Sequence, residues 1–317
     1  IEDGMMKRSY GHDCSRPKFA IMNPKLTYSL PAYQTASGAA DIMMHTMERY
    51  FTPTDTDTSL TDRIAEGLMI SVRDAAQVAV KDPENYDARA TLMWAGSLSH
   101  NGLTGAGRVS DFATHKIEHE LGGMFDVAHG AGLASVWGSW ARYVYKTNPG
   151  RFAQFGEKVF GIDASQTSDS DITDTVLASI TAWETWCHSI DMPTTLTELG
   201  IYPTDSQIEE MAEKCVFGRN GHIGFFQPLT KEGIDMVASD SLGFSSKREQ
   251  YAKINAYTQK VDGRKLMVDA DKIFTQEDPA AQGAPQYSDY KYRAFAYPDV
   301  EVGDQVVLES TLKVTEG

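Results

Sequence analysis

The spacing of apolar residues changes once along the 317-residue chain, and this change sets the fold that the chain can form. From residue 31 to about residue 216, apolar side chains recur at intervals of three and four, which is typical of amphipathic helices. Beyond about residue 230 the interval shortens to two, as in YAKINAYTQKVDGRKLMV, and Asp-Gly and Gly-Asp dipeptides indicate turns. The sequence therefore predicts a multi-domain chain, an all-α domain followed by a partial antiparallel β domain.

Eight helices are expected in the first part, each bounded by Gly, Pro or a cluster of Asp, Ser and Thr. They cover residues 36–51, 60–80, 87–101, 110–121, 129–146, 150–160, 171–189 and 204–216. Ahead of them, KFAIMNP (18–24) predicts a short strand closed by a turn. Between the later strands, TQEDPAAQGAPQYSD (275–289) predicts a mobile loop.

The charge of the chain excludes two classes of partner. The formal net charge is −15, so the electrostatic field of the chain repels nucleic acid and anionic membranes. No run approaches the roughly 20 apolar residues of a membrane-spanning helix, and no secretory signal opens the sequence. The three cysteines, Cys14, Cys187 and Cys215, are scattered and odd in number, which favours a reducing, cytoplasmic compartment.

The first candidate site is an Asp–His pair inside ASGAADIMMHTMERYF (36–51). Asp41 and His45 are four residues apart, so in a helix both side chains can reach one point. The apolar flanks make the polar face of this helix unusually narrow. A solvated Asp–His pair remains the commoner explanation of such a motif, so the pair alone does not establish a metal site.

A second cluster lies in DFATHKIEHELGGMFDVAHGAG (111–132). His115 and His119 are four residues apart, the Gly-Gly after Leu121 is expected to end their helix, and His129 would lie near the start of the next helix. The alternative is a set of histidines bonded at helix ends. Taken with the first pair, the cluster can supply one carboxylate and three imidazoles, a donor set suited to Fe(II) or Zn(II) rather than to Mg or Ca.

Two rival motifs overlap these clusters. HKIEH (115–119) matches the H-x-x-E-H pattern of inverted zinc peptidases, in which both histidines bind zinc and Glu118 is the base. That interpretation gives Asp41, His45 and His129 no role. GLTGAG (102–107) has the glycines of a phosphate loop, but no strand precedes it, and a joint between helices explains it better.

Together the two clusters resemble the iron-containing alcohol dehydrogenases, in particular their NADPH-dependent butanol dehydrogenase and aldehyde reductase branch. The resemblance extends from about residue 15 to about residue 230 and rests on FAIMNPKLTYSLPAYQTASGAADIMMHTMERYF, DPENYDARATLMWAGSLSHNGLTGAG and DFATHKIEHELGGMFDVAHGAGLASVWGSWARYVY. It implies a dehydroquinate synthase-like helical domain. It also implies hydride transfer between NADP(H) or NAD(H) and a small aldehyde or primary alcohol.

The resemblance also implies roles for five residues. The family's metal ligands, for Fe(II) or Zn(II), fall on Asp41, His45, His115 and His129. His119 matches a histidine beside the nicotinamide ring and is a candidate for delivering a proton. The ion would act as a Lewis acid on the carbonyl oxygen.

The resemblance further predicts the domain boundaries. Residues 1–30 would be the remnant of the nucleotide-binding domain, 31–230 the helical metal-binding domain and 231–317 a partial β-sandwich-like domain. The last part resembles the β domain of unknown function that precedes bacterial transglutaminase-like domains, through YTQKVDGRKLMVDADKIF and YPDVEVGDQVVL. An uncovered apolar face would favour a homodimer. The alternative function is a non-catalytic metal-binding fragment fused to a β recognition module.

Overall fold

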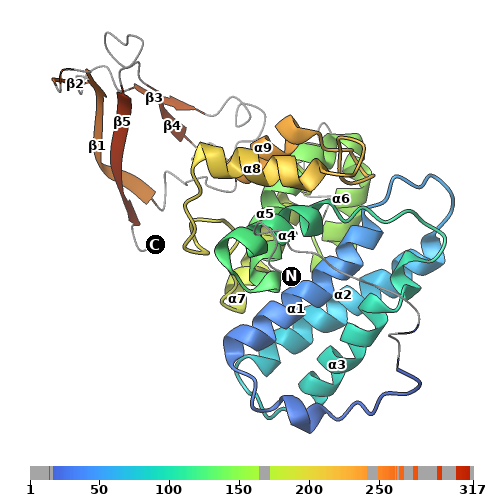
Figure 1. The fold of residues 1–317 in the computed structure, drawn as a ribbon. Coiled ribbons are helices and arrows are strands. Elements are labelled where there is room, and N and C mark those ends of the chain that lie inside the picture. The colour runs from blue at the N-terminus through green and yellow to red at the C-terminus, as the bar shows by residue number, and fades with distance from the viewer. Residues whose placement is uncertain are drawn as a thin grey trace. The chain divides into compact units, whose positions relative to one another are not determined.

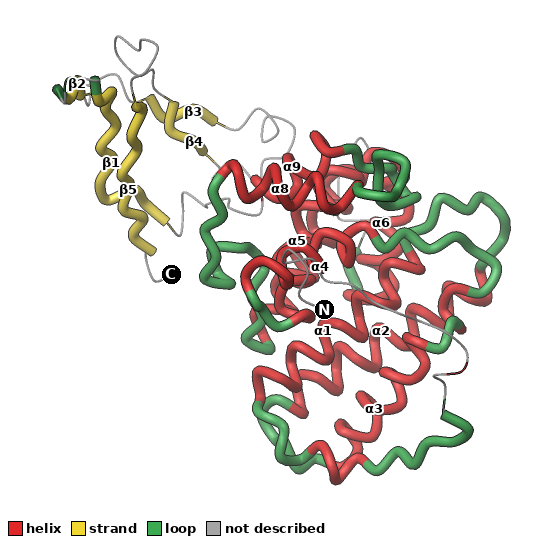
Figure 2. Tube along the Cα trace, viewed as in Figure 1, coloured by secondary structure: helices red, strands yellow, loops and turns green. Residues whose placement is uncertain are grey.

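The computed structural model describes residues 14, 17–163, 172–240, 249–260, 262, 264–267, 274–277, 291–294 and 305–314. The chain divides into two compact units, Ile1–Leu242 and Gly243–Gly317 (Figure 1). The described part of the first unit is helical, and that of the second is built of strands (Figure 2). The sequence prediction of an all-α domain followed by an antiparallel β domain is confirmed.

The helical unit contains α-helices joined by short turns. Their bounds are α1 Ala32–Tyr50, α2 Ser59–Ala79, α3 Tyr86–His100, α4 Ala113–Phe125, α5 His129–Val144, α6 Pro149–Phe155, α7 Ile172–Ser189, α8 Asp205–Val216 and α9 Lys231–Asp240. Shorter helical turns are η2 Pro24–Thr27, η3 Leu103–Gly105, η4 Tyr145–Thr147 and the π-helical η5 Gly156–Phe160. Each of the eight predicted helices is present, with its ends shifted by a few residues.

Helix α1 is central to this unit because it packs against α2, α3 and α5. In Figure 1, α1, α2 and α3 lie side by side. Helix α4 packs against α5 and α8, and α9 packs against α8 and α5. The helices that carry the two sequence clusters, α1, α4 and α5, are therefore joined through α5.

The contact between α1 and α5 depends on a glycine. A Cβ atom added at Gly130, the second residue of α5, would lie 1.9 Å from the backbone oxygen of Ser37 in α1. Only a residue without a side chain permits this approach. The close contact brings the start of α5, with His129, against the helix that carries Asp41.

An aromatic core and a buried ion pair fix the far end of α1. The core joins α1, α5, α6 and α7 through the fully or almost fully buried Tyr50, Phe51, Trp137, Trp140, Phe152, Phe155, Trp183 and Phe226. The guanidinium of Arg151 donates to both carboxylate oxygens of Asp62, at 2.6 and 2.7 Å, and its Nε donates to the backbone oxygen of Tyr50 at 2.8 Å. These contacts hold the last turn of α1 in place.

Three sequence expectations are wrong. Helix α4 does not end at the Gly-Gly after Leu121 but continues to Phe125, and the left-handed Asp126 (φ 52°) ends it, because glycine within a helix is costly but tolerated. Residues 231–240, expected to have strand spacing, form α9, whose apolar face is buried against α8 and α5. Residues 18–24 form no strand, since no described strand lies beside them to share backbone hydrogen bonds.

The second unit consists of two antiparallel sheets in its described part. Strand β1 (Glu249–Gln259) lies between β2 (Lys265–Met267) and β5 (Gln305–Val314), and β3 (Phe274–Glu277) pairs with β4 (Lys291–Ala294). Strands β1 and β2 pair with Gln259 opposite Lys265, and Asp262, the first residue of the predicted Asp-Gly turn, lies in a turn between them. Apart from the first three residues, which belong to β3, the predicted loop 275–289 lies outside the described residues.

No helix in the described part of the chain is long and apolar enough to cross a membrane.

Candidate metal centre

The carboxylate of Asp41 is the centre of a cluster of imidazoles. Its Oδ1 atom lies 3.6 Å from Nε2 of His45, 3.6 Å from Nε2 of His115 and 3.5 Å from Nε2 of His129. Asp41 and His45 come from α1, His115 from the first turn of α4 and His129 from the first position of α5. The structure thus places all three candidate imidazoles around Asp41: the donor atoms of Asp41, His115 and His129 lie within 4.8 Å of one another, and His45 belongs to a second such group with Asp41 and His100.

These distances fit the edges of a coordination shell better than they fit hydrogen bonds. Four donors bound tetrahedrally at about 2.0–2.2 Å from an ion are separated by about 3.4 Å. A hydrogen bond between nitrogen and oxygen would instead be close to 2.9 Å. Asp41 Oδ1 and His115 Nε2 are both buried and have no hydrogen-bond partner among the described residues. Buried polar atoms without a partner are rare, and an ion between these two would satisfy both.

Buried carboxylates hold the other ring nitrogens of two of these histidines. Nδ1 of His115 bonds to Oε2 of Glu48, and Nδ1 of His129 bonds to Oε2 of Glu118. Because a carboxylate only accepts, each Nδ1 carries the proton, and the lone pair of the neutral ring then lies on Nε2. Imidazoles that bind metals are usually held in this way.

The electrostatics of the cluster favour a cation. Burial would raise the pKa of Asp41, but the neighbouring histidines outweigh it and hold that pKa well below its usual range. Burial would lower the pKa of His115, but Glu48 and Asp41 outweigh it and raise that pKa to about 9. Burial, followed by the charge of His115, lowers the pKa of His45 to about 2. A neutral His45 and an ionised Asp41 are the forms that bind a metal ion, whereas His115, with its raised pKa, carries a second proton that a bound metal ion would replace.

His119 lies beside the cluster rather than in it. It is one helical turn beyond His115 on α4, and its ring centroid is 5.6 Å from that of His129 and 6.3 Å from that of His115. The donor atoms of His119, Glu118 and His129 lie within 4.8 Å of one another. His119 therefore flanks the four convergent side chains on the His129 side.

Two nearby residues were missed by sequence reasoning. His100, the last residue of α3, places its Nε2 3.7 Å from the other oxygen of Asp41, and its ring centroid is 3.7 Å from that of His45. In the sequence it has no partner at helical spacing and only marks a helix end. Glu48 is three residues after His45. Its position on the apolar side of the predicted helix was the sequence signal that its carboxylate has a buried partner.

The peptidase interpretation of HKIEH does not agree with this geometry. Glu118, its proposed base, is fully buried, and its Oε2 bonds to His129. Asp41 and His45 converge with His115, although that interpretation gave them no role.

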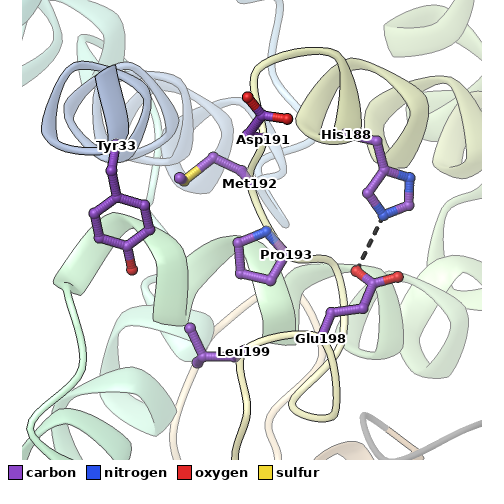
Figure 3. Close-up of a pocket in the computed structure, with 7 residues that line it drawn as sticks. All are labelled: Tyr33, His188, Asp191, Met192, Pro193, Glu198 and Leu199. Atoms are coloured by element: carbon purple, nitrogen blue, oxygen red, sulfur yellow. Dashed lines mark hydrogen bonds and ion pairs between the residues drawn. The ribbon is translucent and has the colours of Figure 1, made fainter. Parts of the chain in front are cut away.

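A separate pocket of about 380 Å³ lies at the start of α1 and the end of α7 (Figure 3). Its lining is Tyr33, His188, Asp191, Met192, Pro193, Glu198 and Leu199. Within it His188 Nε2 lies 3.0 Å from Glu198 Oε2, which also accepts from the backbone N–H of Thr194 at 2.7 Å. His188 and Glu198 are thus joined by a direct hydrogen bond, with no gap for an ion between them.

Curated enzymes are similar to this chain in sequence. NADH-dependent butanol dehydrogenase A of Clostridium acetobutylicum is 34% identical over 229 residues, 72% of this chain and 57% of that protein. The NADPH-dependent aldehyde reductase YqhD of Escherichia coli is 37% identical over 186 residues, 59% of this chain and 46% of that protein. The chain thus spans about half the length of these curated relatives.

Solved structures show the same relationship. The substrate- and cofactor-free form of YqhD from E. coli superposes with a TM-score of 0.65 at 31% identity, covering 71% of this chain and 57% of that chain. NADH-dependent butanol dehydrogenase A from Thermotoga maritima gives 0.62 at 29% identity, covering 68% and 54%.

Two protein families match different parts of the sequence. Residues 225–316 match DUF3857, a domain of unknown function, which confirms the predicted resemblance of the C-terminal part to a β domain of unknown function. Residues 35–242, which include the whole cluster around Asp41 and more than half of the chain, match the Fe-containing alcohol dehydrogenase family, C-terminal. The chain therefore belongs to the Fe-containing alcohol dehydrogenase family.

Proposed function

We propose that Asp41, His45, His115 and His129 bind one Fe(II) or Zn(II) ion. We further propose that the site serves reversible hydride transfer between a nicotinamide cofactor and a small aldehyde or primary alcohol. One observation carries the proposal: the buried, unpartnered Oδ1 of Asp41 lies 3.5–3.6 Å from three imidazole Nε2 atoms. The relatives named for butanol dehydrogenation and aldehyde reduction support the reaction class.

The donor set fits the proposed ion. Three imidazoles and one carboxylate suit borderline divalent metals, and iron is the metal in the family's description. When bound, the ion supplies a Lewis acid that polarises a carbonyl oxygen and stabilises developing negative charge. Asp41 offsets part of the ion's charge, while the neutral imidazoles leave it enough positive charge for this role.

The residues around the cluster orient the ligands. Phe112 lies with its ring centroid 5.6 Å from that of His45 and 5.1 Å from that of His115, and the Arg49 guanidinium covers that ring at 4.8 Å. Glu48 and Glu118 hold two imidazoles from behind. A donor set fixed in this way is preorganised for the electrostatic stabilisation on which such catalysis depends.

His119 is proposed to act on the cofactor side of the site. Its position one turn beyond His115 and next to His129 leaves its ring outside the four convergent donors. A protonated imidazole there would give its proton to an alkoxide, forming the alcohol and leaving the ring neutral. His119→Asn is expected to keep bound metal and to lose turnover. Loss of metal together with turnover would instead make His119 a ligand.

The cofactor and the substrate are inferred from relatives. Their names include both NADH- and NADPH-dependent enzymes. We propose NADP(H) with NAD(H) as the alternative, and short aliphatic aldehydes such as butanal as substrates. Because the chain spans 57% of the length of the butanol dehydrogenase, turnover by this chain is itself part of the proposal.

The proposed function is tested by metal analysis and by an assay. The purified chain is analysed for iron and zinc, and NADPH and NADH oxidation are followed with butanal. One equivalent of metal and chelator-sensitive turnover would support the proposal. Metal without turnover would favour a non-catalytic metal-binding module. Absence of metal binding would contradict the proposal altogether.

We also propose the sequence-derived division into a metal-binding helical domain from residue 31 and a β domain after it, with the boundary moved from residue 230 to Leu242 because α9 packs against α8 and α5. Association of copies is a further proposal, supported by the exposed apolar side chains of Phe19 (79% exposed), Ile21 (85%) and Leu26 (76%). Light scattering of the purified chain would test it, and a monomer at all concentrations would contradict it.

A further inference from the structure

The carboxylate of Glu48 bonds to donors at the start of another helix. Glu48 lies on α1 and is buried, with a 1% exposed side chain. Its Oε1 accepts from the backbone N–H of Thr114 at 2.8 Å and of His115 at 3.2 Å, and from the Thr114 hydroxyl. Its Oε2 accepts from Nδ1 of His115. One side chain of α1 therefore bonds both the backbone and a proposed ligand of α4.

Helix α4 needs this acceptor because its own N-terminal residues provide only part of a cap. Phe112, at the N-cap position, has a left-handed backbone (φ 60°) and makes no side-chain cap hydrogen bond. Asp111 Oδ2 accepts from the N–H of Ala113 at 3.1 Å. Glu48 accepts from the next two N–H groups, which would otherwise lack intrahelical partners. Glu48 thus caps α4 from a different helix.

The same carboxylate decides which nitrogen of His115 can bind a metal ion. A carboxylate facing Nδ1 requires a proton there, so the neutral ring carries its lone pair on Nε2. That Nε2 is buried, has no hydrogen-bond partner among the described residues and lies 3.6 Å from Asp41 Oδ1. The cap of α4 and the tautomer of His115 therefore both depend on Glu48, which is not one of the proposed ligands.

We infer that Glu48 is a positioning residue of the metal centre: it docks α4 on α1 and fixes the His115 tautomer that presents Nε2 to the ion. This inference rests on the proposed metal site. It adds a prediction about a residue that contacts no ion and no substrate.

Glu48→Gln separates the two roles because the amide has nearly the same shape. The two backbone N–H groups of Thr114 and His115 cannot become acceptors, so the amide oxygen must stay with them. The amide NH₂ group then faces Nδ1 of His115 and requires a lone pair there. The proton moves to Nε2 and points at Asp41, where it opposes metal binding.

The affinity test uses the full chain and a matched control. Glu66 is also a buried carboxylate, but its Oε1 accepts from Tyr50 and Gln154 in another part of the helical unit. Zn(II) affinity is measured by competition with a chromophoric chelator. Glu48→Gln is expected to lower the affinity by about 10–100-fold, whereas Glu66→Gln stays within about twofold of wild type. Equal affinities for Glu48→Gln and wild type would overturn the inference.

A second readout detects the proton itself and can be made on the wild type alone. Long-range ¹H–¹⁵N correlation spectra of the zinc-loaded wild type should show a proton on Nδ1 of His115. In apo Glu48→Gln the proton should be on Nε2. An unprotonated Nδ1 in the wild type would overturn the inference even if Glu48→Gln fails to fold. A wild type that binds no zinc would overturn the proposed function as well, so the two failures are distinguishable.

Discussion

Two groups of histidine and carboxylate side chains in the helical unit look alike in composition and differ in geometry. In the pocket of Figure 3, His188 and Glu198 are 3.0 Å apart, both are about 40% exposed, and Thr194 adds a further hydrogen bond. Around Asp41 the corresponding distances are 3.5–3.7 Å, and a buried carboxylate oxygen is left without a partner. In the first group the imidazole and the carboxylate bond directly to each other. In the second group the spacing leaves room for an ion between the side chains.

The comparison shows what distinguishes a ligand cluster from an ordinary ion pair. Residue types alone do not separate the two, since each contains imidazole and carboxylate. What separates them is the unsatisfied atoms at the centre, together with carboxylates that hold the outer ring nitrogens. The unpaired inner atoms lower the stability of the fold unless an ion binds between them. The following substitutions test whether this difference has the expected consequences.

The largest effect is expected for a ligand of the Asp41 cluster. His129→Ala removes one of three imidazoles facing Asp41 Oδ1, and metal affinity should fall by more than the roughly 10–100-fold cost of losing an outer partner. Catalysis by the intact enzyme should be lost with the metal. Inductively coupled plasma mass spectrometry measures metal content after dialysis. Retention of a full equivalent by a folded variant would remove His129 from the ligand set.

The next effect tests how the helices bring the ligands together. Gly130→Ala places a Cβ atom 1.9 Å from the backbone oxygen of Ser37, so α5 must move away from α1. Overpacking of this kind costs about 1–3 kcal/mol, and metal affinity should fall too because His129 moves from Asp41. Gly67→Ala in α2, where no atom lies within 4 Å, is the control and should stabilise by about 0.5–1 kcal/mol. Urea unfolding measures the free energy of unfolding of both variants, and chelator competition measures their metal affinity. If Gly130→Ala had the stability and metal affinity of the wild type, the close packing of α5 on α1 would be contradicted.

A smaller effect is expected for His100. Its Nε2 faces the second oxygen of Asp41, and its side chain is 42% exposed, unlike the 5% exposed His115. His100→Ala should therefore change Zn(II) affinity by about tenfold at most, the lower end for an outer partner. Chelator competition gives the value. A loss as large as that of His129→Ala would place His100 among the ligands.

The smallest effect is expected in the comparison pocket. His188→Ala removes a partner of Glu198 that is 40% exposed, and such exposed pairs contribute about 0.2–1 kcal/mol to stability. Metal content should remain that of the wild type. Thermal unfolding and metal analysis of the same sample test both statements. Loss of metal in a stable His188→Ala protein would break the distinction between the two groups.

Much of the helical unit could be predicted from sequence because its signals are local. The spacing of apolar residues located the eight predicted helices, and the four-residue interval placed Asp41 beside His45. The strand predicted at residues 18–24 is wrong because a strand depends on a neighbour that the local pattern does not show. The end of α4 was misplaced because Gly122 and Gly123 are compatible with a helix.

The candidate site was only partly predictable for the same reason. Its four convergent side chains came from two local motifs and a family resemblance, and convergence required the tertiary contact of α1, α4 and α5. Glu48 and His100 contribute only through that contact, since their partners are 67 and 59 residues away in sequence. No periodic pattern reports such pairs.

X-ray absorption at the zinc edge of the zinc-loaded chain tests the central claim most directly. The account predicts a shell of nitrogen and oxygen at about 2.0–2.1 Å with scattering from three imidazole rings. A shell containing sulfur at about 2.3 Å, or one with fewer than two imidazoles, would contradict the assignment of Asp41, His45, His115 and His129 to one ion.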